Sequence, residues 1–246
     1  MTGERGKRGA KQAAAPLGQR ARNKRDKLNR ITHAARKLFV SKGFDDATLR
    51  EIAARAGVGL GTVFLYAANK RDLLFLIVNE GLEEAIAAAQ AAVRPDAPLL
   101  DNLLTVFRHQ YVFFARQPAL SRLVLREMTF YESGAQARAF QATRDALIAL
   151  IGNTVAQAMR QGRIAAAETP QLVGWTIFCI FQVELRRWVA AGGLDLRHGL
   201  RHGMNRLRRT LNVCITGLNP AKPAPSRRAR RVRRPRAAAS ATPSAG

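Results

Sequence analysis

Apolar residues recur at helical spacing along most of the chain, and no segment shows the alternation of apolar and polar residues that is typical of a strand. The first such series ends at Lys42–Gly43 and consists of Leu28, Ile31, Ala35, Leu38 and Phe39. Two short helices are predicted next, at 48–56 and 59–66, and Gly57 stops the first of them. The sequence therefore predicts an all-α protein that begins with three short helices.

A longer amphipathic helix is predicted from Asn69 to Val93, where Arg94–Pro95 ends it. Further helices are expected at about 99–116, 118–130, 135–161, 170–191 and 195–216. We therefore expect four segments: a disordered basic extension (1–21), a three-helix unit (22–68), a larger helical domain (69–218) and a disordered Arg-rich tail (219–246).

The formal net charge of +24 is concentrated at the two ends of the chain. Residues 1–30 hold ten basic and two acidic residues, and residues 219–246 hold eight basic and no acidic ones. Such tails indicate a polyanionic partner, and nucleic acid is the one that we expect. The alternative for the C-terminal tail is that arginine and alanine reflect a GC-rich genome and have no specific role.

The composition argues against secretion and membrane insertion. Cys179 and Cys214 lie in apolar stretches and indicate neither a disulfide framework nor a metal site. The longest apolar run, near 175–183, is too short to span a bilayer, and no apolar segment follows the N-terminal charges. We therefore expect a cytoplasmic protein.

No enzymatic site can be assembled from the motifs of the chain. Segment 57–62 is rich in glycine like a phosphate-binding loop, but no strand precedes it and no lysine follows at the required place. His198 and His202 stand four apart on one helix face, but no acidic partner lies between them, which favours surface histidines over a metal site. We expect no catalytic residue, no metal and no cofactor.

A capping box marks the first of the two short helices. The Thr48 hydroxyl can accept from the Glu51 amide, while the Glu51 carboxylate reaches back to Thr48. A short helix, a turn with glycine and a second short helix make a helix-turn-helix, in which the second helix lies in the major groove of DNA. Segment 48–66 is therefore predicted to bind duplex DNA.

The order of residues across this stretch strongly resembles the signature of TetR-family transcription regulators. The segments that carry the resemblance are Ile31-x-x-Ala34-x-x-x-Leu38-Phe39, Lys42-Gly43-Phe44, Ala47-Thr48-Leu49-Arg50-Glu51-Ile52-Ala53, Ala56-Gly57-Val58, Gly61-Thr62-Val63-Phe64 and Asn69-Lys70-Arg71-Asp72-Leu73-Leu74. The resemblance implies an all-α protein of about nine helices, in which the first three bind DNA and the later ones form a ligand pocket and a dimer interface.

The resemblance also implies the residues that contact DNA. They are Thr48, Arg50, Leu60, Gly61, Thr62, Val63, Phe64, Tyr66 and Lys70. Thr48 would meet a phosphate at a helix N-terminus, and Arg50 would reach a base or a phosphate. Leu60, Thr62 and Val63 would face base edges and backbone. Phe64, Tyr66 and Lys70 would contact phosphates.

Two residues depart from the family pattern. Gly59 stands where the family usually has Ser, and Phe64 where it usually has Tyr, so two hydroxyls that can bind phosphate are missing. Tyr66 and the basic segment Arg20–Lys27 are expected to compensate in part. Core packing is the alternative for Phe64, and a solvated polar face is the alternative for Thr62 and Lys70.

The larger domain contains most of the aromatic residues. Pockets between helices are lined by such groups with a few polar anchors, although ordinary core packing is the alternative for each of them. The expected ligand-binding residues are Phe107, Tyr111, Phe114, Glu127, Phe130, Trp175 and Phe178. A largely apolar or aromatic small molecule is the expected effector.

The last two predicted helices, 170–191 and 195–216, suit half of an intersubunit four-helix bundle, as the family resemblance implies. We therefore expect a homodimeric repressor in the bacterial cytoplasm that associates with the nucleoid, binds a palindromic operator and responds to a ligand. The alternative is a protein that coats DNA through charge alone, without sequence preference.

Overall fold

The structure is a computed structural model and describes residues 18–191 and 196–218, with the side chains of 199–216 in the last segment. All regular elements of the described residues are helices, which confirms the predicted all-α fold. The predictions for 1–17 and 219–246 lie outside the described residues. Helix α1 (Gln19–Ser41) begins before residue 22, where we expected the first unit to start.

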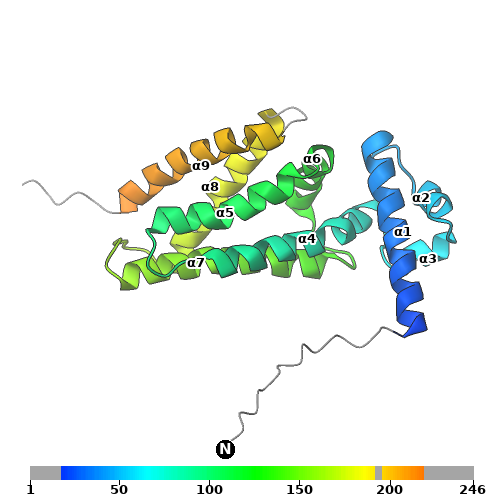
Figure 1. Ribbon diagram of the computed structural model, residues 1–246, viewed down its shortest axis with the longest axis horizontal. Coiled ribbons are helices and arrows are strands. Elements are labelled where there is room, and N and C mark those ends of the chain that lie inside the picture. The colour runs from blue at the N-terminus through cyan, green and yellow to red at the C-terminus, as the bar shows by residue number, and fades with distance from the viewer. Residues whose placement is uncertain (1–17, 192–195, 219–246) are drawn as a thin grey trace, which may run out of the picture.

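Three helices form the N-terminal unit: α1, α2 (Leu49–Ala56) and α3 (Leu60–Phe64). Only the second half of α1 contributes to the core of this unit, with Ile31, Leu38 and Phe39 among its buried residues. The first half, from Gln19 to Lys27, is largely exposed. Figure 1 shows the unit at one end of the molecule, with α4 (Lys70–Ala92) leading from it into the rest.

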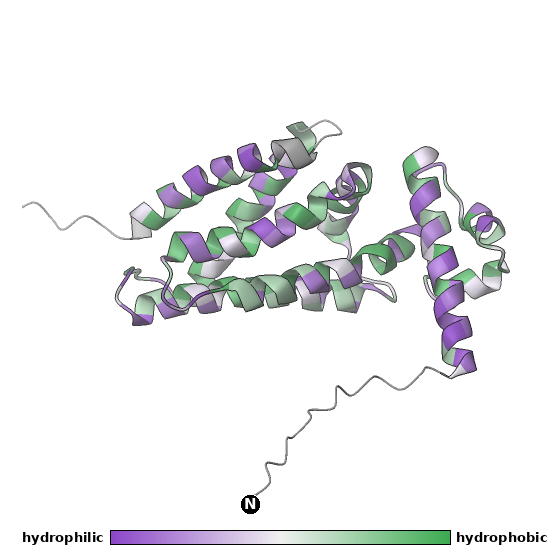
Figure 2. Cartoon of the chain, viewed as in Figure 1, coloured by the Kyte–Doolittle hydropathy of each residue, from purple (hydrophilic) through white to green (hydrophobic). Residues whose placement is uncertain are grey.

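The remaining helices form a bundle with α4. They are α5 (Leu99–Ala115), α6 (Pro118–Glu127), the short 3₁₀ helix η1 (Met128–Phe130), α7 (Ala137–Arg160), α8 (Pro170–Ala191) and α9 (Leu196–Leu218). Helix α7 packs against α8 and α4, and α5 packs against α4 and α9. Figure 2 shows a hydrophilic outer side and a hydrophobic inner side on α9, as the helical periodicity predicts.

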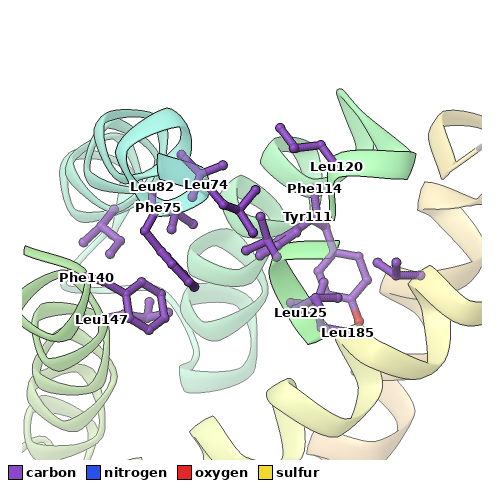
Figure 3. Packing of buried hydrophobic residues seen from close by; sticks show 14 of the residues in the cluster. Leu74, Phe75, Leu82, Tyr111, Phe114, Leu120, Leu125, Phe140, Leu147 and Leu185 are labelled. Atoms are coloured by element: carbon purple, nitrogen blue, oxygen red, sulfur yellow. The ribbon is translucent and has the colours of Figure 1, made fainter. Parts of the chain in front are cut away.

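Aromatic side chains fill the core of the bundle. Phe107 of α5 stacks on Phe181 of α8 with ring centroids 4.4 Å apart, and Phe75 of α4 stacks on Tyr131 at 4.0 Å. Leu82, Phe114, Phe140, Leu147 and Leu185 are among the residues that meet in this core (Figure 3). Helices α7 and α8 approach closely because both carry glycine at the contact: a Cβ on Gly174 would lie 2.7 Å from the Cα of Gly152.

The predicted breaks agree closely with the observed helix ends. The predicted helix over 118–130 is divided, since its last turn is the 3₁₀ helix η1, and the helix predicted over 135–161 extends from Ala137 to Arg160. No helix in the described residues is long and apolar enough to cross a membrane.

Candidate functional site

Local interactions define both ends of α2. The Thr48 Oγ1 accepts from the Glu51 amide at 3.2 Å, and the Thr48 amide donates to Glu51 Oε2 at 2.9 Å, which confirms the predicted capping box. The Lys42 ammonium and the Thr48 hydroxyl and amide lower the pKa of Glu51 to about 2. Gly57 ends α2 with a φ of 63°, in the left-handed region where a side chain is unfavourable.

Helix α3 has a buried side and an exposed side. Val63 is 0% exposed and packs into the core of the N-terminal unit. The prediction that Val63 faces base edges is therefore wrong for its side chain, because no part of that side chain reaches the surface. Phe64 and Leu65 are 52% and 82% exposed, and Thr62 lies half-buried beside them. The alternative for Phe64 was core packing, and a ring that is half exposed is not packed in the core.

Leu65 was not among the residues predicted to contact DNA. It stands just beyond α3 and is the most exposed of the large apolar side chains in the described residues. The helical period puts Leu65 two positions after the buried Val63, so its exposure was open to prediction. The predicted contacts were carried over from positions of the family, and these included Phe64 and Tyr66 but not Leu65.

The first half of α1 lies beside α3 and is basic. The Tyr66 hydroxyl donates to the carbonyl oxygen of Lys24 at 3.3 Å, so the end of α3 is tied to this part of α1. Arg20, Arg22 and Arg25 are exposed on the same segment. On α2, Arg50 is also exposed. The structure thus places the basic first half of α1 next to the end of α3.

Lys70 holds the loop between α1 and α2. Its Nζ donates to the carbonyl oxygens of Phe44 at 2.8 Å and Asp45 at 2.7 Å, and it lies 5.2 Å from the centroid of the Phe44 ring. An ammonium group has three donors, so one remains for another acceptor. Lys70 therefore does not belong to a solvated polar face, which was the alternative for it.

An ion-pair cluster joins α6 to the N-terminal unit. Arg126 makes two hydrogen bonds to the Asp45 carboxylate, at 3.0 and 3.1 Å, and its Nε donates to Glu127 at 2.8 Å. Arg71 donates to the other oxygen of Glu127 at 2.9 Å. We call Asp45, Arg71, Arg126 and Glu127 the α6 ion-pair cluster. Glu127 was expected in the ligand pocket, but both of its carboxylate oxygens are used here.

Asp72 forms a second connection, between the start of α4 and the start of α7. Its buried carboxylate accepts from the Tyr131 hydroxyl, the Gln136 amide at 2.7 Å and the Ala68 amide at 2.9 Å. Burial opposes ionisation of Asp72, but these hydrogen bonds together lower its pKa below the usual value. Burial and the hydrogen bond to Asp72 raise the pKa of Tyr131.

A small cavity of about 40 Å³ lies inside the bundle. Its wall comes from α4, α5, η1, α7 and α8, and is mostly apolar, with Leu82, Ile86, Phe114, Phe178 and Leu185 among the side chains. Of the residues expected to bind a ligand, Phe114 and Phe178 border this cavity. Phe107 and Tyr111 are buried in the neighbouring core, where both contact Phe181.

The structure does not bring Phe130 and Trp175 to the cavity. Phe130 is 80% exposed at the end of η1, and Trp175 is 46% exposed on α8. Trp175 shares the outer side of α8 with the exposed Leu172 and Val183. The apolar stripe on this helix covers more than one face, and the sequence did not tell which aromatic residue would be inside.

A groove of about 940 Å³ lies between α8 and α9 on the outside of the bundle. Ile180 and Glu184 of α8 and Arg206 and Val213 of α9 are among its lining residues. The Nε of Arg206 lies 2.8 Å from Glu184 Oε2. Among the described residues, no three His, Cys, Asp or Glu side chains lie close enough together to hold a metal ion. The side chain of His198 is not among those that the structure describes.

The comparisons with known proteins agree with one another: the family model and the solved structures both point to TetR-family regulators. Residues 31–77 match the family model of the DNA-binding domain described as "Bacterial regulatory proteins, tetR family". The chain is 22% identical over 171 residues to the fatty acid metabolism regulator protein of Bacillus subtilis, covering 68% of this chain and 86% of that protein.

Solved structures with the same fold include two FadR transcriptional regulators. Thermus thermophilus FadR, a TetR family repressor in complex with lauroyl-CoA, is 26% identical, covers 81% of this chain and 99% of its own, and has a TM-score of 0.57. Bacillus subtilis FadR in complex with stearoyl-CoA is 19% identical, covers 73% and 96%, and has a TM-score of 0.58.

The helix-turn-helix unit on a larger helical bundle defines a DNA-binding transcription regulator. Residues 31–77 match the DNA-binding domain of the TetR family, and the chain as a whole is similar to TetR-family regulators.

Proposed function

We propose that the protein is a homodimeric repressor that binds a palindromic operator in the bacterial cytoplasm and leaves it when an acyl ligand enters the bundle. The exposed side of α3 carries the DNA-binding part of this proposal. It presents Gly61, Thr62 and Phe64, with Leu65 directly after them, beyond the turn at Gly57 and at the position of the recognition helix in a helix-turn-helix.

Direct contacts to base edges are proposed for Thr62, Phe64 and Leu65. Apolar side chains contact the methyl group of thymine in the major groove, and burial against DNA would remove both exposed apolar groups from water. Leu60 and Gly61 belong to the same interface, where the missing side chain of Gly61 lets the DNA backbone approach. Val63 is left out because it is buried.

Phosphate contacts are proposed for residues around this helix. Thr48 marks the N-terminus of α2, whose amides attract an anion, and Arg50 is exposed on its first turn. Lys70 has one donor left for a phosphate, and Tyr66 connects α3 to the basic half of α1. These positive charges add affinity that is independent of sequence and decreases with salt.

The outer sides of α8 and α9 are proposed as the dimer interface. Leu172, Trp175 and Val183 of α8 and Val213 of α9 are exposed apolar side chains, and the groove between the two helices can receive a helix of a second copy. A twofold contact would cover these residues and set two copies of α3 at a fixed distance, hence a palindromic operator.

The apolar cavity is proposed as the effector site. The acyl-CoA complexes of the Thermus and Bacillus FadR proteins support an acyl chain as the apolar part of the ligand. Arg144 borders the cavity, and Arg186 is hydrogen-bonded to Gln182 of its wall at 2.6 Å. Two cations near the rim suit the anionic head group of such a ligand.

Ligand entry must move the helices that hold the N-terminal unit. A cavity of about 40 Å³ is far smaller than ligand pockets of roughly 300–1,000 Å³, so the wall has to open. Leu82 and Ile86 lie on α4, which carries the DNA-binding unit, and Met128 follows Arg126 and Glu127 of the α6 ion-pair cluster. Opening the wall would therefore change the spacing of the two recognition helices.

Selection of binding sites from random duplex DNA tests the proposal. We expect enrichment of a palindrome by the wild-type protein, and loss of that enrichment in a variant with Arg50→Ala and Thr62→Ala. The control carries Arg160→Ala, which removes the same charge at an exposed position of α7, next to Gln161 and Pro95 at the opposite end of α4 from the N-terminal unit. Tight binding without an enriched motif would instead support a protein that coats DNA through charge.

Two further measurements separate the parts of the proposal. In a gel-shift titration, lauroyl-CoA is expected to dissociate the protein from the selected operator. Val183→Asp is expected to turn the dimer into a monomer in sedimentation analysis, because it places a charge in the proposed interface. A dimer that persists in Val183→Asp would contradict the α8–α9 interface without affecting the DNA site.

A further inference from the structure

Gln110 of α5 is a buried polar residue without an evident structural role. Its side chain is 2% exposed, and its Nε2 is buried with no hydrogen-bond partner among the described residues. An unpaired buried donor is unfavourable, because folding removes its bonds to water and returns none. The residue borders the interior cavity.

Two other polar residues of the cavity wall, Thr143 and Gln182, already make hydrogen bonds. The Thr143 hydroxyl donates to the carbonyl oxygen of Ala139 at 2.9 Å, and Gln182 Oε1 accepts from Arg186 at 2.6 Å. The described residues contain several buried polar atoms without a partner, and of these only Gln110 Nε2 belongs to the wall. Gln110 thus supplies the one free buried donor of a mostly apolar site.

We propose that Gln110 determines the specificity of the effector site by donating a hydrogen bond to a carbonyl oxygen of the ligand. This inference rests on the proposed function and specifies the ligand further: an acyl compound such as a thioester or an ester, and not a plain hydrocarbon chain. Burial makes the bond selective, since an analogue without the acceptor leaves the donor unpaired inside the protein.

A pair of ligands that differ only in this acceptor gives the test. Lauroyl-CoA has the thioester carbonyl, and S-dodecyl-CoA has a methylene group in its place. In isothermal titration calorimetry, we expect the wild-type protein to bind lauroyl-CoA about tenfold more tightly than the thioether. Gln110→Leu is expected to bind the two compounds within about twofold of each other, because its side chain has no donor.

Two further variants test whether the loss of discrimination comes from the missing donor of Gln110. Gln110→Met provides a second apolar side chain of similar length, in case Gln110→Leu folds poorly, and it is expected to lose the discrimination as well. Gln90→Leu makes the same change at an exposed position of α4 and is expected to keep the tenfold ratio of the wild-type protein. Equal affinities of the wild-type protein for the two CoA compounds would overturn the role of Gln110 and leave the effector class intact.

The inference is tested even if the proposed CoA ligand is wrong. Failure of the wild-type protein to bind either CoA compound would overturn the proposed effector. Methyl laurate and tridecane are then compared as competitors of a fluorescent apolar probe bound to the protein. Stronger competition by the ester, lost in Gln110→Leu, would support the inference, and equal competition or none would overturn it.

Discussion

The helix-turn-helix unit and the interior of the bundle place their side chains in opposite ways. The unit leaves large apolar groups uncovered, with Phe64 and Leu65 at the surface, while the bundle buries polar groups such as Asp72 and Gln110. A surface that binds a large partner can keep apolar groups exposed until the partner covers them. A site for a small ligand must instead keep a polar group ready inside. The contrast separates groups that hold the fold together from groups available to a ligand.

The largest expected effect is on a buried polar group that has partners. Asp72→Ala removes the acceptor of Tyr131, Gln136 and Ala68 and leaves their donors unpaired. We expect the free energy of unfolding to fall by about 3 kcal/mol in guanidinium titrations. Asp145→Ala, at an exposed carboxylate, is the control and is expected to change it by less than about 0.5 kcal/mol. A small effect of Asp72→Ala would show that the connection between α4 and α7 is not important for stability.

The two sides of α3 give the next prediction. Val63→Ala makes a cavity in the N-terminal unit and is expected to cost about 2 kcal/mol of unfolding free energy. Leu65→Ala removes an exposed side chain, so we expect a stability change below about 0.5 kcal/mol and a loss of operator affinity of about tenfold. Thermal unfolding and fluorescence anisotropy with the selected operator measure the two quantities. Unchanged affinity in Leu65→Ala would remove this residue from the proposed interface.

The turn between α2 and α3 is expected to show a smaller effect. Gly57→Ala places a side chain in the left-handed region and should destabilise the protein by about 1 kcal/mol. Gly59→Ala is the matched control, because Gly59 has a φ of −68° and open space where the added methyl group would lie. Chemical denaturation compares the two variants, and equal stabilities would contradict the strain at Gly57.

The smallest effect is a pH dependence. The pKa of Glu51 is about 2 in the folded protein, against an ordinary value of 4.5, so the ionised capping box contributes stability above about pH 4.5. That contribution is lost as the pH falls through about 2. The difference in melting temperature between the wild-type protein and Glu51→Gln should therefore shrink from about pH 5 to about pH 2. Glu132→Gln, an exposed control, should show no such trend.

Features set by local sequence were predictable. Thr48 and Glu51 form the expected capping box, and Gly57 has the conformation that a turn at this place needs. The helix ends follow prolines and glycines, for example Pro118 at the first position of α6. These features depend on a few neighbouring residues, so the sequence alone contains the information.

Features that depend on distant contacts were not predictable. Glu127 was expected near a ligand, but Arg71 and Arg126 hold it in the α6 ion-pair cluster. Phe130 and Trp175 were grouped with the buried aromatic residues, and both are exposed. An apolar helix face predicts that something covers it, without telling whether its own chain or another copy does so.

The sequence by itself determined the all-α fold, the turn and the resemblance of the N-terminal unit to the TetR family, because helical periodicity, caps and a spaced motif are properties of neighbouring residues. The tertiary structure alone decided which residues are available for function. Val63 and Leu65 lie two positions apart, yet one is buried and the other exposed. Gln110 became a candidate only when packing surrounded its amide with apolar side chains, since burial and the lack of a partner depend on residues far away in the chain.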